Sequence, residues 1–180
     1  MTFQLVEPIL LIGLGGVGAR LAEKAKKSLN SDCLLISHDQ KDLTIENSIK
    51  ISTKSVVNPS THLIRGSTLE TSDEIKKNIA NYSTIILMSN LAGKAGAGIG
   101  PIVSRICKQE QKNLLSFVVM PFKFEKERIF QSGIALKRIR QDSQCTIVVD
   151  NDALLDSNPD LTQNQCYDIS NKAIESMMHS

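Results

Sequence analysis

Two glycine-rich stretches stand out, because glycine spacing of this kind can bring main-chain N–H groups close to an anion. The first, GLGGVGAR, occupies residues 13–20, and the second, NLAGKAGAGIGP, occupies residues 90–101. Each follows an apolar run and precedes an amphipathic one, which is the strand-turn-helix context in which such loops hold phosphate. Two loops of this type predict a phosphate chain that is held from two sides.

The candidate binding residues are the glycines of these stretches and their immediate neighbours. In the first stretch they are Gly13, Gly15, Gly16, Gly18 and Arg20. In the second stretch they are Gly93, Lys94, Ala95, Gly96, Ala97 and Gly98. Lys94 could add a positive charge to the N–H groups around it. The plainer alternative is that the glycines only permit tight turns and close packing and that Lys94 is solvated.

Other side chains give little sign of catalysis or of metal binding. The cysteines and histidines lack the spacing of metal ligands: Cys33, Cys107, Cys145, Cys166, His38, His62 and His179. Surface or turn positions are the better interpretation of the histidines, and free thiols in a reducing compartment explain the cysteines. We therefore expect no catalytic residue and no protein-bound metal site.

The bulk composition predicts one aliphatic globular domain over residues 1–180. Apolar residues make up 41% of the chain and charged residues 22%, and the net charge is +2, so nothing suggests a nucleic-acid partner. The N-terminus has no basic region of a signal peptide, and no apolar run is long enough to span a bilayer. A cytoplasmic location is the expectation.

Apolar runs alternate with helical patterns along the chain. Strands are predicted over 8–15, 33–39, 83–90, 113–121 and 145–151, and helices over 17–29, 72–81, 101–112, 129–140 and 162–178. Residues 41–71 are predicted to be irregular, with one strand-like piece, SIKIS. The nearly continuous apolar runs are typical of parallel strands buried on both faces. The pattern predicts an α/β, doubly wound, mainly parallel sheet with helices on both faces.

Several segments together resemble the GTPase domain of the FtsZ/tubulin superfamily, nearer to the prokaryotic cell-division protein FtsZ than to eukaryotic tubulin. The first glycine stretch resembles the family's GVGGGGGNA loop, CLLISHDQKDL resembles its NTDxxxL segment, and HLIRG resembles its LTRG. The second glycine stretch resembles the signature loop GMGGGTGTGAAP. The most specific pieces are PFKFE (121–125) and DNDALL (150–155), in segments that resemble VVTxPFxFEGxxR and GIxxLxxxVDSxIxIPNDKLL.

This resemblance implies the family's Rossmann-like fold and a guanine nucleotide, GTP or GDP, as ligand, with Mg²⁺ as a further candidate cofactor. By position, Gly15, Gly16 and Gly18 would contact the α- and β-phosphates. Residues 93–98 would form the loop for the β- and γ-phosphates.

The same resemblance assigns four further positions outside the glycine stretches. Asp39 stands at the family's acidic position after the second strand, and Glu125 stands where the family contacts ribose. Arg128 lies near an arginine on the base or sugar side. Asp168 aligns with the residue that reads guanine, and a carboxylate suits that role because guanine presents two adjacent donors.

The chain also departs from the family pattern. Ala95 and Ala97 stand where the signature loop has threonines, and Lys94 replaces a glycine. The sequence stops before the family's activating loop and second domain, so we expect weak or no GTP hydrolysis by the chain alone. The resemblance implies guanine nucleotide as a partner, together with self-association or an FtsZ-like filament partner.

Two other interpretations remain open at this stage. Asp39 lies 21 residues after Gly18, which is the spacing of the ribose-binding acid in NAD-dependent Rossmann oxidoreductases. The second glycine stretch and the lack of an evident hydride-transfer site speak against that assignment. The lost threonines favour a third interpretation, a nucleotide-free structural or interaction paralogue of FtsZ.

Overall fold

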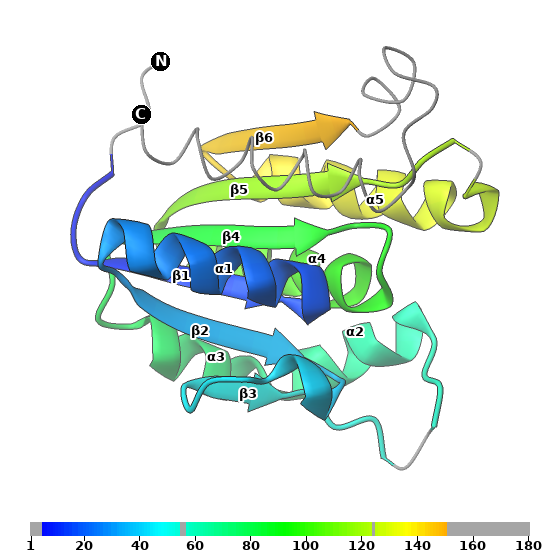
Figure 1. Cartoon of the computed structure of the whole chain (residues 1–180), viewed down its shortest axis with the longest axis horizontal. Coiled ribbons are helices and arrows are strands. Elements are labelled where there is room, and N and C mark those ends of the chain that lie inside the picture. Colours follow the sequence, from blue (N-terminus) through cyan, green and yellow to red (C-terminus); the bar gives the residue numbers. More distant parts are fainter. Residues whose placement is uncertain (1–4, 55–56, 124, 151–180) are drawn as a thin grey trace.

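The described part of the chain forms one six-stranded parallel sheet in the order β3-β2-β1-β4-β5-β6 (Figure 1). The computed structural model describes residues 5–54, 57–123 and 125–150, so Asp168 and the helix predicted over 162–178 lie outside the described residues. The strands are β1 (Ile9–Leu14), β2 (Asp32–Ser37), β3 (Ser48–Lys50), β4 (Thr84–Asn90), β5 (Asn113–Met120) and β6 (Cys145–Asp150). The helices are α1 (Gly15–Leu29), α2 (Thr61–Glu70), α3 (Ser72–Ile79), α4 (Lys94–Gln109) and α5 (Lys126–Asp142), with a short 3₁₀ helix, η1 (Gln40–Asp42).

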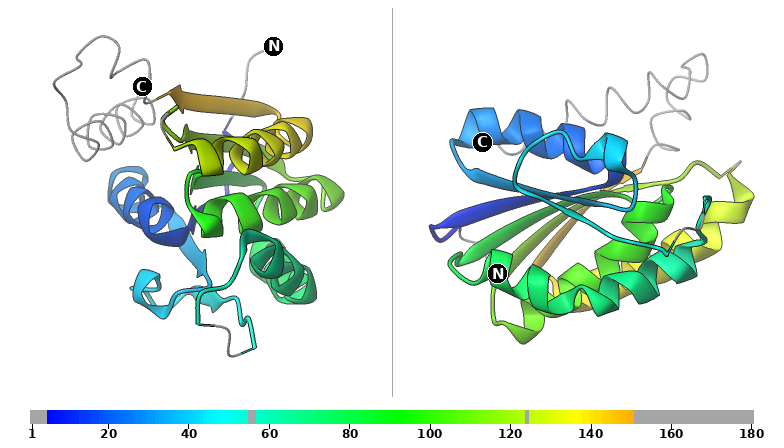
Figure 2. Two further views of the ribbon diagram at one scale, coloured as in Figure 1. Left: turned by 90° about the vertical axis from the view of Figure 1, so that its right-hand side faces the viewer. Right: turned by 90° about the horizontal axis from the view of Figure 1, so that it is seen from below.

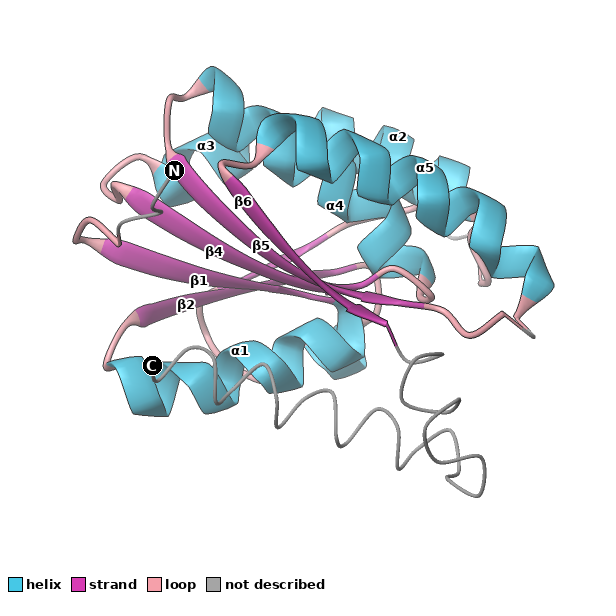
Figure 3. Ribbon diagram, turned by 90° about the horizontal axis from the view of Figure 1, so that it is seen from above, coloured by secondary structure: helices cyan, strands magenta, loops and turns pink. Residues whose placement is uncertain are grey.

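Helices lie on both faces of the sheet, and the predicted doubly wound α/β fold is confirmed. Helix α1 covers one face, and α2, α3, α4 and α5 lie on the other (Figures 2 and 3). Successive residues of a central strand enter opposite cores. In β4, Ile85 and Leu87 pack on the α4 side, whereas Ile86 and Met88 pack on the α1 side. This alternation explains why the central strands are apolar throughout.

The strand order reverses between β1 and β4, and this reversal places the two glycine stretches side by side. From β1 the chain winds outward to β2 and β3, and from β4 it winds the other way to β5 and β6. Strand β1 pairs with β4 along its whole length, from Ile9 opposite Thr84 to Leu14 opposite Ser89. Their carboxyl ends lead directly into α1 and α4. In open parallel sheets, the crevice at such a switch point is where ligands bind.

The prediction of an irregular segment over residues 41–71 is wrong. This segment contains β3, which includes part of the strand-like SIKIS piece, and helix α2. The α2 sequence THLIRGSTLE has a central glycine and weak helical patterning, so propensity alone did not indicate it. Tertiary contacts stabilise it: Ser60 caps its start by accepting a hydrogen bond from Leu63 N at 3.2 Å, and Ile64 is fully buried.

The prediction that a helix begins at Pro101 is also wrong. Helix α4 begins at Lys94, so most of the second glycine stretch forms its first two turns and Pro101 lies inside it. Glycine and proline lower intrinsic helix propensity, which is why the sequence suggested a loop. Packing overrides propensity here, because the missing side chains let α4 lie directly against β4. The other elements predicted within the described residues are confirmed with boundary shifts of a few residues.

The close approach of α1 to β4 at Gly18 leads to a prediction about stability. A Cβ at Gly18 would lie 2.4 Å from the carbonyl oxygen of Met88, whereas a Cβ at Gly133, which is exposed within α5, meets nothing within 4 Å. Gly18→Ala should therefore lower the free energy of unfolding by about 3 kcal/mol through overpacking. Gly133→Ala should raise it by about 0.5–1 kcal/mol through helix propensity. Urea denaturation followed by circular dichroism measures both, and equal effects of the two variants would contradict the packing explanation.

Candidate functional site

Helices α1 and α4 both begin at the carboxyl edge of the sheet without a side-chain cap. Among the described residues, no side chain caps either start, and neither helix has an acidic residue in its first turn. Helix α2 and η1 differ, because Ser60 and Asp39 cap them. An uncapped helix start leaves main-chain N–H groups and the positive end of the helix dipole available to an anion. The two uncapped starts are adjacent.

The two glycine stretches converge on one pocket of about 180 Å³. A Cβ at Gly15, which has φ of +69°, would lie 2.9 Å from the Cβ of Ala95, so the two stretches nearly touch. The residues that line the pocket come from β1, α1, the segment after β2, β4 and α4: Leu14, Gly15, Gly16, Val17, His38, Asp42, Asn90, Gly93, Lys94, Ala95 and Gly96. Six of the predicted binding residues are thus brought together.

The remaining glycines of the two stretches serve packing behind the pocket. A Cβ at Gly13 would lie 2.4 Å from the carbonyl oxygen of Gly18, and one at Gly98 would lie 3.0 Å from Ile64. Ala97 is buried in a core cluster with Ile139. Gly96 does both, because it lines the pocket and a Cβ there would lie 2.1 Å from the carbonyl oxygen of Asn90. The close-packing alternative therefore applies to part of each stretch.

Polar side chains in the pocket are few and mostly engaged. The Lys94 ammonium is exposed and donates a hydrogen bond to Asn58 Oδ1 at 2.8 Å. The Asp42 carboxylate accepts a hydrogen bond from the Ser37 hydroxyl at 2.7 Å. The Oδ1 of Asn90 accepts one from Ala92 N at 3.0 Å. The pocket therefore combines one cation, one carboxylate and many backbone groups.

Four other predicted residues lie in the described part of the chain but do not line this pocket. Asp39 is exposed and caps η1 by accepting a hydrogen bond from Lys41 N at 3.0 Å. Arg20 is near the rim, with its Nη1 3.9 Å from the position of a Cβ on Gly16. The Glu125 carboxylate accepts a hydrogen bond from Phe122 N at 2.7 Å and lies 3.7 Å from the Arg128 guanidinium. Glu125 and Arg128 lie at the carboxyl edge of the sheet, where the chain passes from β5 to α5.

Three polar residues that line the pocket were missed from the sequence: His38, Asp42 and Asn90. His38 was expected to be an ordinary surface or turn histidine. It does lie just after β2, but it is one of the residues that line the pocket, and its Nδ1 is buried without a hydrogen-bond partner. A usable signal existed, because polar residues directly after parallel strands gather at the ligand edge of the sheet.

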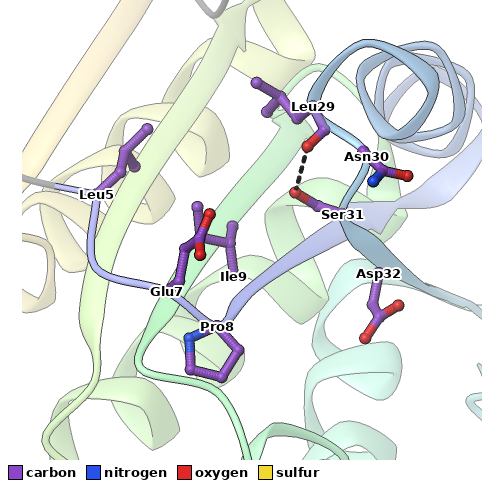
Figure 4. Close-up of a pocket in the computed structure, with 8 residues that line it drawn as sticks. All are labelled: Leu5, Glu7, Pro8, Ile9, Leu29, Asn30, Ser31 and Asp32. Carbon is purple, nitrogen blue, oxygen red and sulfur yellow. Dashed lines mark hydrogen bonds between the residues drawn. The ribbon is translucent and has the colours of Figure 1, made fainter.

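A larger cavity of about 760 Å³ lies at the amino ends of the strands, away from the glycine stretches (Figure 4). Its side chains come from residues 5–9 and from the turn between α1 and β2, where the Ser31 hydroxyl donates to the Leu29 carbonyl at 3.3 Å. Glu7 and Asp32 line it, and Asp32 also accepts a hydrogen bond from the Tyr82 hydroxyl at 2.6 Å. Helices in this sheet begin at the opposite edge, so this cavity lacks the helix starts that favour anions.

Metal binding by side chains alone finds no support in the described residues. No group of three or more histidine, cysteine or acidic side chains is placed there to hold an ion. Burial raises the pKa of Cys33 to about 11 and that of Cys107 to about 12, so both thiols stay protonated at neutral pH. In the same residues, no helix is long and apolar enough to cross a membrane.

Comparison with known proteins identifies the family. The model of the tubulin/FtsZ family, GTPase domain, matches residues 60–159, which is more than half of the chain. The chain belongs to the tubulin/FtsZ family. The cell division protein FtsZ 2 of Halobacterium salinarum is 25% identical over 180 residues, with 92% of this chain and 44% of that protein covered. FtsZ of Helicobacter pylori is 30% identical over 102 residues, with 54% of this chain and 26% of that protein covered.

Solved structures show the same fold. The empty FtsZ dimer of M. jannaschii superposes with a TM-score of 0.81 at 20% identity, covering 94% of this chain and 54% of that one. CetZ from Methanosaeta thermophila gives 0.73 at 18% identity, covering 93% and 51%. The chain therefore spans about half the length of the relatives that it matches. The interpretation as an NAD-dependent oxidoreductase finds no support in these comparisons.

Asp42 is the one carboxylate among the described residues that line the pocket, and it leads to a prediction about anion binding. Asp42→Asn removes a negative charge that faces the two helix starts, so affinity for inorganic pyrophosphate should rise by roughly three- to tenfold without divalent cations. The control is Asp39→Asn, which removes a neighbouring charge outside the pocket and should change affinity by less than twofold. Isothermal titration calorimetry measures both. Equal affinities in the two variants would show that the anion binds elsewhere.

Proposed function

We propose that this chain binds GTP or GDP, as the nucleotide-binding domain of an FtsZ-like protein of the cell-division cytoskeleton. The observation that carries the proposal is the convergence of two uncapped helix starts and two glycine stretches on one pocket at the switch point of the sheet. Backbone N–H groups in this arrangement complement an oligophosphate. Family membership makes guanosine the expected nucleoside.

The phosphates would lie between Gly15 and Gly16 on one side and residues 93–96 on the other. Gly13, Gly18, Ala97 and Gly98 would support the cradle from behind instead of contacting the nucleotide. The pocket volume of about 180 Å³ is below the range of about 300–1,000 Å³ that is usual for whole small molecules. The pocket would therefore hold phosphate groups while the nucleoside extends along the edge of the sheet.

Ribose and base recognition remain part of the proposal, carried by residues beyond the pocket. Glu125 and Arg128 begin the segment that follows β5 at the same sheet edge, and their mutual contact would orient the carboxylate toward ribose. Asp168 would accept the adjacent N1–H and N2–H₂ donors of guanine. Arg20 would contribute positive charge at the rim, and Asp39 would act indirectly by capping η1, which carries Asp42.

Mg²⁺ fits the chemistry of this donor set when phosphates are present. Magnesium is usually held by one or two carboxylates together with phosphate oxygens and water, and Asp42 is the carboxylate that lines the pocket. When bound, the ion would neutralise charge on the phosphates. The Ser37 hydroxyl, which donates a hydrogen bond to Asp42, would hold that carboxylate in place beside the ion.

Weak or no hydrolysis by the chain alone belongs to the same proposal. Enzymes that hydrolyse nucleoside triphosphates need a positioned water as well as a phosphate cradle. Asp42 is the carboxylate available in the pocket, and its engagement with Ser37 leaves it poorly suited to activate water. A cytoplasmic location and self-association, or assembly with an FtsZ-like filament partner, complete the proposal. A nucleotide-free role is the outcome expected if no guanine nucleotide binds.

Gly16 allows a sharp test of nucleotide binding. A Cβ there would meet the flexible ends of two side chains, Asp42 at 3.0 Å and Arg20 at 3.9 Å, so Gly16→Val should fold while blocking approach of a phosphate to the start of α1. Affinity for GTP should fall at least tenfold, through loss of a hydrogen bond to a charged group that contributes about 1.5–3 kcal/mol. The matched control is Gly66→Ala, at an exposed glycine of α2 with nothing within 4 Å.

Calorimetry with GTP and with ATP measures the effect and the base preference, and chromatography of the bound nucleotide after incubation reports hydrolysis. We expect the chain to bind GTP more tightly than ATP. Binding should be lost in Gly16→Val but kept in Gly66→Ala, and chromatography should show little conversion of GTP to GDP. Equal binding of ATP and GTP, or undiminished binding by Gly16→Val, would refute it.

A further inference from the structure

The phosphate pocket contains a side-chain donor that has no assigned partner. Among its described lining residues, the side chains able to donate hydrogen bonds are those of His38, Asn90 and Lys94. Lys94 already donates to Asn58, and Asn90 is oriented by Ala92 N. Within the described part of the chain, the His38 ring makes no hydrogen bond, and its Nδ1 is a buried orphan. His38 is therefore the donor whose partner has still to be identified.

The buried Nδ1 determines where the neutral ring carries its proton. A proton on Nδ1 would create a buried N–H without an acceptor, which is unfavourable because the group loses its hydrogen bond to water. The proton of the neutral imidazole is thus expected on Nε2. His38 is only partly buried and lines the pocket, and on this basis we infer that its Nε2–H is the donor for a ligand there.

The groups around the His38 ring favour an anion as the acceptor of its hydrogen bond. The nearby pocket wall consists largely of glycine and alanine main chain at two helix starts, which offers further donors. The competing acceptor in the pocket is Asp42, whose Oδ2 is taken by Ser37 and whose Oδ1 lies toward Gly16. An oxygen of a phosphate would satisfy the imidazole and both helix starts together.

We propose that His38 Nε2–H donates a hydrogen bond to a phosphate oxygen of the bound nucleotide, opposite the main-chain N–H groups of α1 and α4. This inference rests on the proposed function and adds a specific recognition residue to it. Since the pocket holds phosphate groups and not the nucleoside, the contribution of His38 is larger for GTP and GDP than for guanosine.

Two substitutions at His38 distinguish loss of the hydrogen-bond donor from loss of side-chain packing. His38→Leu removes the donor, and GTP affinity is expected to fall by about ten- to a hundredfold, whereas affinity for guanosine changes less than twofold. His38→Gln keeps an N–H donor at the end of the side chain, and affinity is expected to stay within about fivefold of the unsubstituted chain. The control is His62→Leu, at an exposed histidine of α2 outside the pocket, which should leave affinity unchanged.

Nitrogen NMR of the unsubstituted chain, labelled with ¹⁵N-histidine, provides a readout that does not depend on a folded variant. Saturating GDP is expected to shift the His38 Nε2 resonance and to leave Nδ1 unprotonated. An unshifted Nε2 resonance in the nucleotide complex, or wild-type GTP affinity in His38→Leu, overturns the inference while the proposed function stands. Absence of any guanine-nucleotide binding by the unsubstituted chain overturns both.

Discussion

Close main-chain contact between strand ends and helix starts is the constraint on which the rest of this structure depends. Helix α1 can follow β1 as it does only because Gly13 and Gly18 lack side chains, and α4 can lie on β4 only because Gly96 does. Each missing Cβ removes a clash with a backbone carbonyl, which cannot move without disturbing the sheet or helix α1. The glycines therefore determine where two helices lie, in addition to any contact that they make with a ligand.

Those two helices determine the chemistry of the pocket. Their starts are uncapped among the described residues, and they meet where the order of strands reverses. In the proposed complex, backbone N–H groups and helix dipoles would provide most of the attraction for an anion, so few side chains would be needed. His38, Asp42 and Lys94 adjust a site whose geometry is already set by the main chain. Loss of hydroxyls at Ala95 and Ala97 is compatible with such a site.

Much of the fold could be predicted because the central strands are continuous apolar runs. The periodicity of α1 and α3 was equally informative, but α2 and the start of α4 depend on contacts that a local pattern does not contain. Residues of both glycine stretches line one pocket. Which glycines line it and which support it could not be predicted, because that depends on how closely Met88 and Asn90 approach them. The proposal for His38 could not be made from the sequence, because it depends on a buried nitrogen without a partner.

The central claim is that both glycine stretches hold one oligophosphate at the same time. Amide hydrogen exchange resolved to single residues measures this directly when it is recorded with and without saturating GDP. The account predicts slower exchange at Gly15 and Gly16 together with Lys94, Ala95 and Gly96, at the same nucleotide concentration. Protection at only one of the two stretches, or at neither while GDP is bound, would contradict it.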